Sequence, residues 1–143
     1  MDICADCDIY FVFTVQKEVG MRGAKILSRR YDVDTVITVD TVCADDMYKS
    51  DCKAISLGKG IVIPAMDKYS INDRELIKKL ENTKHQKAIT KNEFSDAGAF
   101  PTKRVNISIP CRYAKTPVEM ISKSDLETAK TALKELISDI SGE

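Results

Sequence analysis

A strand–helix–strand pattern near the N-terminus constrains the fold of this chain more than any other feature. Residues 9–15 are apolar or β-branched without alternation, which is typical of a strand covered on both faces. Residues 20–30 have apolar side chains at helical spacing, and residues 35–39 form a second apolar, β-branched run. Together they occupy about thirty residues, the length of one βαβ unit. The pattern predicts two parallel strands joined by a helix, and therefore an α/β fold.

The remainder of the chain continues the alternation of strands and helices. The sequence predicts further strands at 61–67, 86–90 and 105–109, and helices at 74–80 and 122–140. In the last helix, Ser124 and Glu127 have the spacing of a capping box. No linker, repeat or low-complexity segment interrupts residues 1–143. We therefore expect one domain with a mixed, largely parallel sheet flanked by helices.

Composition excludes several classes of function. Lys plus Arg and Asp plus Glu both number 22, so no net charge attracts nucleic acid or an anionic membrane. No apolar run approaches the roughly 20 residues of a membrane span. The N-terminus is acidic and the number of cysteines, 5, is odd, which together predict a cytoplasmic protein with reduced thiols. Cys4 and Cys7 have the spacing of half a zinc site or a redox pair, but without a second ligand pair we favour incidental cysteines.

Charged residues follow the first two predicted strands at the point where each strand ends. Lys17 and Glu18 come after residues 9–15, and Asp40 comes directly after residues 35–39. Parallel strands end at the same edge of a sheet, so the two carboxylates could converge there and suit a divalent cation. The alternative is that both acids only cap the turns that follow their strands.

Three longer motifs carry a resemblance to a known family. They are residues 13–24 (Phe-Thr-Val-Gln-Lys-Glu-Val-Gly-Met-Arg-Gly-Ala), residues 96–99 (Asp-Ala-Gly-Ala) and residues 107–119, which include Cys-Arg-Tyr and Thr-Pro-Val-Glu. In these motifs the chain resembles the glutamyl and deblocking aminopeptidases, dinuclear metallopeptidases that include the tetrahedral aminopeptidases and proteins named endoglucanase or cellulase M. Residues 36–40 are similar to the family strand that ends in a metal-binding Asp.

The resemblance implies a zinc-peptidase-like catalytic domain with two zinc or cobalt ions at the strand ends. A metal-bridged water would attack the N-terminal peptide bond of a peptide substrate, with a Glu as general base. Glu18 and Asp40 stand at family positions for metal ligands. Lys17, however, stands where the family has the general-base Glu, and Lys115 stands where it has a metal-ligating His. The motifs do not assign residues to the substrate pocket.

The length of the chain is a second reason, besides these two substitutions, to expect reduced activity. Residues 1–143 resemble only the C-terminal part of the family's catalytic domain, without the inserted β-rich domain used in oligomer assembly. We therefore expect a truncated or degenerate homologue with little or no aminopeptidase activity. A second reading is a non-catalytic assembly or binding subunit, either as a homo-oligomer or paired with a related or complementary chain.

The two lysines allow a further pair of interpretations. Lys17 or Lys115 could act as a nucleophile or base of changed chemistry if its ammonium group lost a proton in an apolar pocket. Alternatively, Lys17 pairs with Glu18 or Asp40, and its charge then takes the place of the metal's charge. The second interpretation is favoured, because lysines close to acids are more often found in salt bridges.

Overall fold

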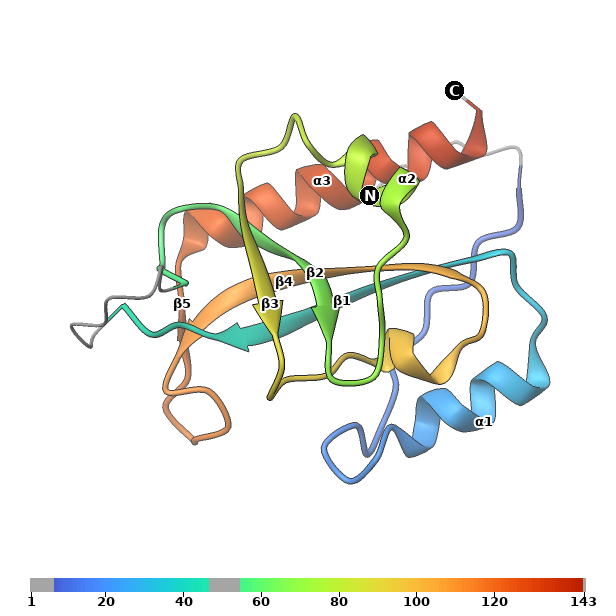
Figure 1. Cartoon of the computed structure of the whole chain (residues 1–143), viewed down its shortest axis with the longest axis horizontal. Helices are drawn as coiled ribbons and strands as arrows, with labels where there is room; N and C mark the ends of the chain where they lie inside the picture. The colour runs from blue at the N-terminus through green and yellow to red at the C-terminus, as the bar shows by residue number, and fades with distance from the viewer. Residues whose placement is uncertain (1–6, 47–54, 143) are drawn as a thin grey trace.

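The structure, a computed structural model, describes residues 7–46 and 55–142 (Figure 1). Cys4, one member of the Cys4–Cys7 pair, lies outside these residues. In sequence order the elements are α1 (Arg22–Arg30), β1 (Thr35–Cys43), β2 (Ile61–Asp67), α2 (Arg74–Lys79), β3 (His85–Thr90), the 3-10 helix η1 (Asp96–Ala99), β4 (Lys103–Arg112), β5 (Met120–Ile121) and α3 (Lys123–Ser141).

The strands form one mixed, largely parallel sheet, as the sequence predicts. Its order is β1-β4-β2-β3, with β5 paired to β4. The pairs β1–β4 and β2–β3 are parallel, whereas β2–β4 and β4–β5 are antiparallel. The β2–β3 register shifts between Pro64 and Met66, and a proline within a strand is tolerated at such an irregularity because it has no N–H to donate. Because β1 begins the sheet, one of its edges has no strand neighbour among the described residues.

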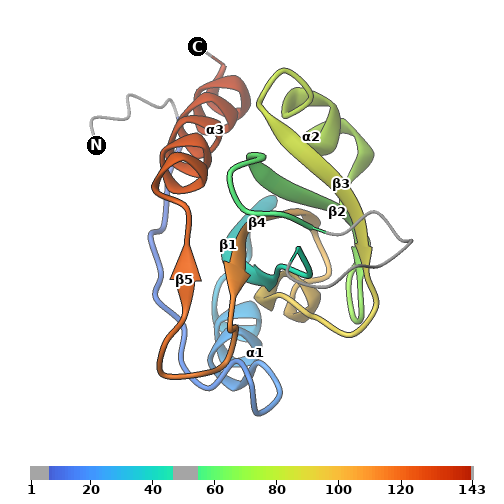
Figure 2. The same cartoon turned by 90° about the vertical axis from the view of Figure 1, so that its left-hand side faces the viewer.

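Helices lie on both sides of the sheet. Figures 1 and 2 show α2 and α3 on one side and α1 on the other. The main core lies between the sheet and the pair α2 and α3, and it consists of aliphatic side chains whose burial supplies most of the driving force for folding. Its buried members are Ile61, Ile63, Leu76, Leu80, Val105, Ile107, Ile109, Ala129, Ala132 and Leu136.

The start of α3 differs from the prediction. The N-cap residue is Ser122, its side chain makes no capping hydrogen bond, and Ser124 already lies inside the helix. The predicted capping box of Ser124 and Glu127 is therefore wrong. The carboxylate of Asp125, which is fully buried, accepts hydrogen bonds from the backbone N–H groups of Gly58 and Gly60 instead. The first turn of α3 thus holds the loop that precedes β2.

The N-terminal apolar segment, residues 9–15, is the largest departure from the predicted fold. It forms no strand, and most of its large side chains are exposed. Figure 1 shows it as an unpaired blue trace that leads into α1. The prediction of a buried strand is wrong for the described residues: the segment pairs with no strand, and most of its large side chains are not covered by other parts of the described chain.

Candidate functional site

A tight turn places Lys17 and Glu18 ahead of α1. The backbone N–H groups of Gly20 and Met21 both donate to the carbonyl oxygen of Lys17, and Met21 adopts a left-handed conformation before the helix begins. Asp40 comes from β1, whose strand continues to Cys43. The predicted convergence of the two acids is therefore present, although the segment that precedes Glu18 is not a strand.

An ammonium group lies between these two carboxylates. Lys17 Nζ is 2.6 Å from Asp40 Oδ2 and 3.2 Å from Glu18 Oε1. It also lies 5.2 Å from the centre of the Phe94 ring, a distance at which the negative ring face attracts a cation. These contacts match the interpretation in which Lys17 forms ion pairs with Glu18 and Asp40.

Lys115 extends this arrangement from the other side. It lies in the loop between β4 and β5 in a left-handed conformation, with φ of 65°. Its Nζ is 3.3 Å from Glu18 Oε2 and 3.4 Å from Glu93 Oε2. The result is a chain of alternating charges, Asp40–Lys17–Glu18–Lys115–Glu93, which we call the ion-pair chain.

The protonation states of the two lysines follow from their neighbours. Partial burial lowers the pKa of Lys17, but the hydrogen bonds and charges of Asp40 and Glu18 outweigh it, so its pKa lies above the ordinary value. Burial likewise lowers the pKa of Lys115, and Glu18 and Glu93 raise it further than burial lowers it. Both side chains are therefore cationic at neutral pH. A cationic lysine is neither a base nor a nucleophile, which argues against the changed-chemistry interpretation.

The carboxylate oxygens of the predicted metal ligands already have donors. Asp40 Oδ1 accepts from the Thr41 backbone N–H, and the other three oxygens of Asp40 and Glu18 contact the ammonium groups of Lys17 or Lys115. The described residues contain no group of three or more His, Cys, Asp or Glu that could hold a metal ion. Two metal ions at this position would face two ammonium charges, so the residues present do not fit a dinuclear metal centre.

The pairing of Glu18 predicts a specific dependence of stability on pH. Burial raises the pKa of Glu18, but Lys17 and Lys115 outweigh it, so the pKa is lowered from its ordinary 4.5. The carboxylate therefore stabilises the fold above pH 4.5, and this contribution is lost as the pH falls through the lowered pKa. Because Glu18 is half exposed, we expect less than about 1 kcal/mol.

Urea unfolding of the wild type and Glu18→Gln between about pH 7 and about pH 3 measures this contribution. The wild type should be the more stable protein at neutral pH, and the difference between the two should shrink towards acid. Lys115→Met should also reduce the acid dependence, because it removes one of the two cations that lower the pKa. Parallel pH curves for the wild type and Glu18→Gln would contradict this assignment.

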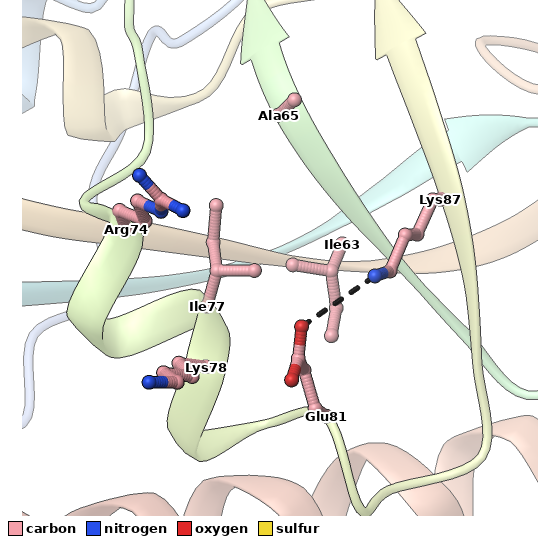
Figure 3. Close-up of a pocket in the computed structure, with 7 residues that line it drawn as sticks. All are labelled: Ile63, Ala65, Arg74, Ile77, Lys78, Glu81 and Lys87. Carbon is pink, nitrogen blue, oxygen red and sulfur yellow. Dashed lines mark ion pairs between the residues drawn. The ribbon is translucent and has the colours of Figure 1, made fainter.

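A cavity of about 310 Å³ lies elsewhere, between α2 and strands β2 and β3 (Figure 3). Glu81 and Lys87 form an ion pair of 3.5 Å across it. The residues that line it are Ile63, Ala65, Arg74, Ile77, Lys78, Glu81 and Lys87. None of them belongs to the ion-pair chain, so the cavity and the predicted site are separate features.

Two members of the arrangement could not be predicted. Glu93 and Phe94 lie between β3 and η1, in a stretch that carries no family motif. The ordinary pattern of hydrophobicity gives no sign that Glu93 pairs with Lys115. Only the geometry of the folded chain brings the two side chains together.

Similar folds occur in solved aminopeptidase structures. A TET aminopeptidase from a marine sediment archaeon of the Thaumarchaeota superimposes with a TM-score of 0.82 at 28% identity, covering 90% of this chain and 40% of that one. The Pyrococcus horikoshii TET1 peptidase gives a TM-score of 0.74 at 32% identity, with 87% and 39% covered. The fold therefore defines this chain as aminopeptidase-like.

The sequence comparison identifies the family. The model of the M42 glutamyl aminopeptidases matches residues 2–131, and the chain belongs to that family. A protein of Acetivibrio thermocellus, named as a candidate aminopeptidase, is 38% identical over 145 residues, which cover 92% of this chain and 43% of that protein. The chain thus spans about two fifths of the length of the relatives it matches.

Proposed function

We propose that this chain is an M42-family protein in which lysine ammonium groups replace the metal ions of the family's site. The observation that carries the proposal is the position of Lys17 Nζ, 2.6 Å from Asp40 and 3.2 Å from Glu18. On this proposal the chain does not by itself hydrolyse N-terminal peptide bonds with zinc or cobalt. The general-base position holds a cation, and the carboxylates at the ligand positions are neutralised by the protein itself.

Metal content and turnover test the proposal together. We expect the purified 143-residue chain, dialysed against zinc or cobalt, to retain substoichiometric metal. We also expect it to release no nitroaniline from a panel of aminoacyl-nitroanilides, including the glutamyl and lysyl derivatives. Turnover that is present in the wild type and disappears in Glu18→Ala would overturn the proposal, whereas equal traces in both proteins would indicate contamination.

Restoring the family residue types at positions 17 and 115 tests the same proposal through metal binding, without a catalytic assay. The double variant Lys17→Glu and Lys115→His adds a fourth carboxylate and an imidazole to those of Asp40, Glu18 and Glu93, and zinc binds both kinds of donor. Without metal their mutual repulsion should lower its melting temperature, and zinc should restore about 5 °C or more. Lys25→Glu makes the same charge change as Lys17→Glu at an exposed position on α1, and it should show no such response to zinc. A wild type that zinc stabilises as strongly as the double variant would contradict the proposal.

A second candidate function is assembly with another polypeptide. The observation that favours it is the N-terminal apolar segment, whose large side chains are exposed in the structure. The Pyrococcus horikoshii TET1 peptidase assembles into a tetrahedron or a large octahedral shell, so a related structure forms oligomers. In this second proposal the chain is a non-catalytic subunit that corresponds to the C-terminal part of a family catalytic domain. It binds a chain that supplies the remainder.

The compartment proposed for either function is the cytoplasm. Cys7, Cys43 and Cys111 are free thiols in the structure, which supports a reducing environment. No helix among residues 7–46 and 55–142 is long and apolar enough to cross a membrane.

A further inference from the structure

We propose that an extended strand of a complementary polypeptide pairs with the free edge of β1 and is covered by the N-terminal apolar segment. The complementary polypeptide is one that corresponds to the part of a family member this chain does not span. The inference rests on the second candidate function and adds the place and the chemistry of the contact. It does not depend on whether a metal ion binds at the ion-pair chain.

The first observation is the exposure of the N-terminal apolar segment. Phe13 is 97% exposed, and its large neighbours are between 49% and 66% exposed. These neighbours are Tyr10, Phe11, Val12 and Val15. Single exposed apolar residues are common, but six consecutive positions of aromatic and β-branched residues form a continuous patch of the kind that marks an interaction surface.

The second observation is the state of β1. Its sequence is apolar and β-branched, as for a strand buried on both faces, yet most of its residues are only partly buried and Val39 is 47% exposed. It pairs along its length with β4 on one side. Among the described residues nothing pairs with its other edge, so its outward backbone groups are available to an added strand.

The third observation is that the two uncovered stretches lie alongside each other. The Tyr10 ring is 5.3 Å from that of Tyr31, shortly before β1 begins, and Lys17 contacts Asp40 near the other end of β1. The N-terminal apolar segment therefore runs in the same direction as β1. No backbone hydrogen bond of the structure joins the two within the described residues. They are held side by side at both ends but remain unpaired between them.

These observations favour a strand as the occupant. Residues of the N-terminal apolar segment have high β propensity, and the outer edge of β1 offers an unused ladder. A strand bonded to β1 would place its side chains against the exposed apolar residues. A helix would cover the side chains but would leave the edge of β1 unpaired.

The comparisons favour a complementary chain over a second copy. More than half of the Acetivibrio thermocellus relative, and of the structures compared, lies outside the matched region. A polypeptide of that kind can supply both a strand and a layer that covers the outer face of the segment. A second copy would offer only the same N-terminal apolar segment and the same β1 edge, and no strand from outside this chain.

Co-expression provides the test. The full 143-residue chain is produced together with the portion of the Acetivibrio thermocellus protein that lies outside the matched region. We expect the two to copurify as a 1:1 complex. In that complex, hydrogen exchange should slow by about tenfold or more at residues 9–15 and 35–43, relative to the chain alone. The amides of β3 should exchange at an unchanged rate.

Two matched variants locate the contact. Phe13→Asp changes a side chain that is already exposed, so it should leave the stability of the isolated chain unchanged while weakening the complex about tenfold or more. Ile89→Asp, at a 58% exposed position on β3, makes the same chemical change on the opposite edge of the sheet and should not weaken the complex.

The possible outcomes test the pairing, its location and the choice of partner separately. Failure to copurify would overturn both the pairing and its location. A complex that Phe13→Asp leaves intact, or one that protects β3 instead of β1, would overturn the location while the pairing stands. Self-association of the chain that Phe13→Asp abolishes would show a second copy as the occupant and would overturn the choice of partner.

Discussion

Gly60→Ala should unfold the chain or destabilise it by more than about 4 kcal/mol, the largest effect we expect from a single substitution. Gly60 has φ of 89°, and a Cβ at this position would lie 2.0 Å from the backbone oxygen of Lys84 and 2.6 Å from its carbonyl carbon. Backbone atoms of the β2–β3 connection cannot move aside without loss of the hydrogen bond from Ile61 to Lys84. Urea unfolding followed by circular dichroism measures the effect.

Gly58 supplies a matched control in the same loop. Its φ of 78° is also left-handed, but a Cβ there would meet no atom within 4 Å. Gly58→Ala should therefore cost only the conformational strain of about 1–2 kcal/mol. The difference between the two variants isolates the steric contact. Equal losses of stability in the two variants would show that backbone strain alone sets the loss, and that the added Cβ does not overlap the backbone of Lys84.

Asp125→Ala is expected to cost about 3–5 kcal/mol, because it removes a buried charged acceptor and leaves two backbone donors without a partner. The carboxylate accepts from Gly58 N at 2.7 Å and from Gly60 N at 2.9 Å, with no exposed surface. Asp125→Asn keeps one acceptor and should lose about 2 kcal/mol. The free energy of unfolding is the quantity to measure.

An exposed acid on the same helix is the control for this substitution. Asp139 lies 3.9 Å from Lys79 and its side chain is half exposed. Asp139→Ala should change the free energy of unfolding by less than about 0.5 kcal/mol. If Asp125→Ala were equally mild, α3 would not hold the loop before β2 through this carboxylate.

The sequence predicts most of the regular elements because their signals are local. The run at residues 61–67 contains its own β-forming side chains and is bounded by a glycine turn, and the structure has β2 at the same residues. The predicted helix at 74–80 corresponds to α2, with Asp73 as its N-cap. The burial of the polar side chains of Asn106 and Ser108 has no such local signal. They are buried in β4 and hydrogen-bond to each other, which depends on the neighbouring strands.

The N-terminal apolar segment shows that local sequence signals do not determine whether a stretch is buried. Its sequence has the composition of a buried strand, but burial depends on what covers it, and nothing in the described chain covers most of its large side chains. Asp125 illustrates the same point in the opposite sense. An acidic residue in the first turn of a helix is usually exposed, yet a loop more than sixty residues away in sequence covers Asp125.

For the candidate site, the sequence gives the positions but not the complete geometry. Glu18 and Asp40 converge on Lys17, although Glu18 follows no strand and Asp40 lies within β1 rather than at its end. Their roles as metal ligands, and the roles assigned to Lys17 and Lys115, remain predictions. Glu93 could not be predicted because its contact with Lys115 joins two loops, and no periodic pattern relates residues in separate loops.

The ion-pair chain has a consequence for how the fold depends on its surroundings. A site that neutralises its carboxylates with a dissolved cation gains stability only in proportion to the logarithm of that ion's concentration. Lys17 and Lys115 are attached to the same polypeptide, so their charges are present at a fixed effective concentration. Charge balance at this edge of the sheet is therefore a constant property of the chain, the same where divalent cations are scarce as where they are abundant.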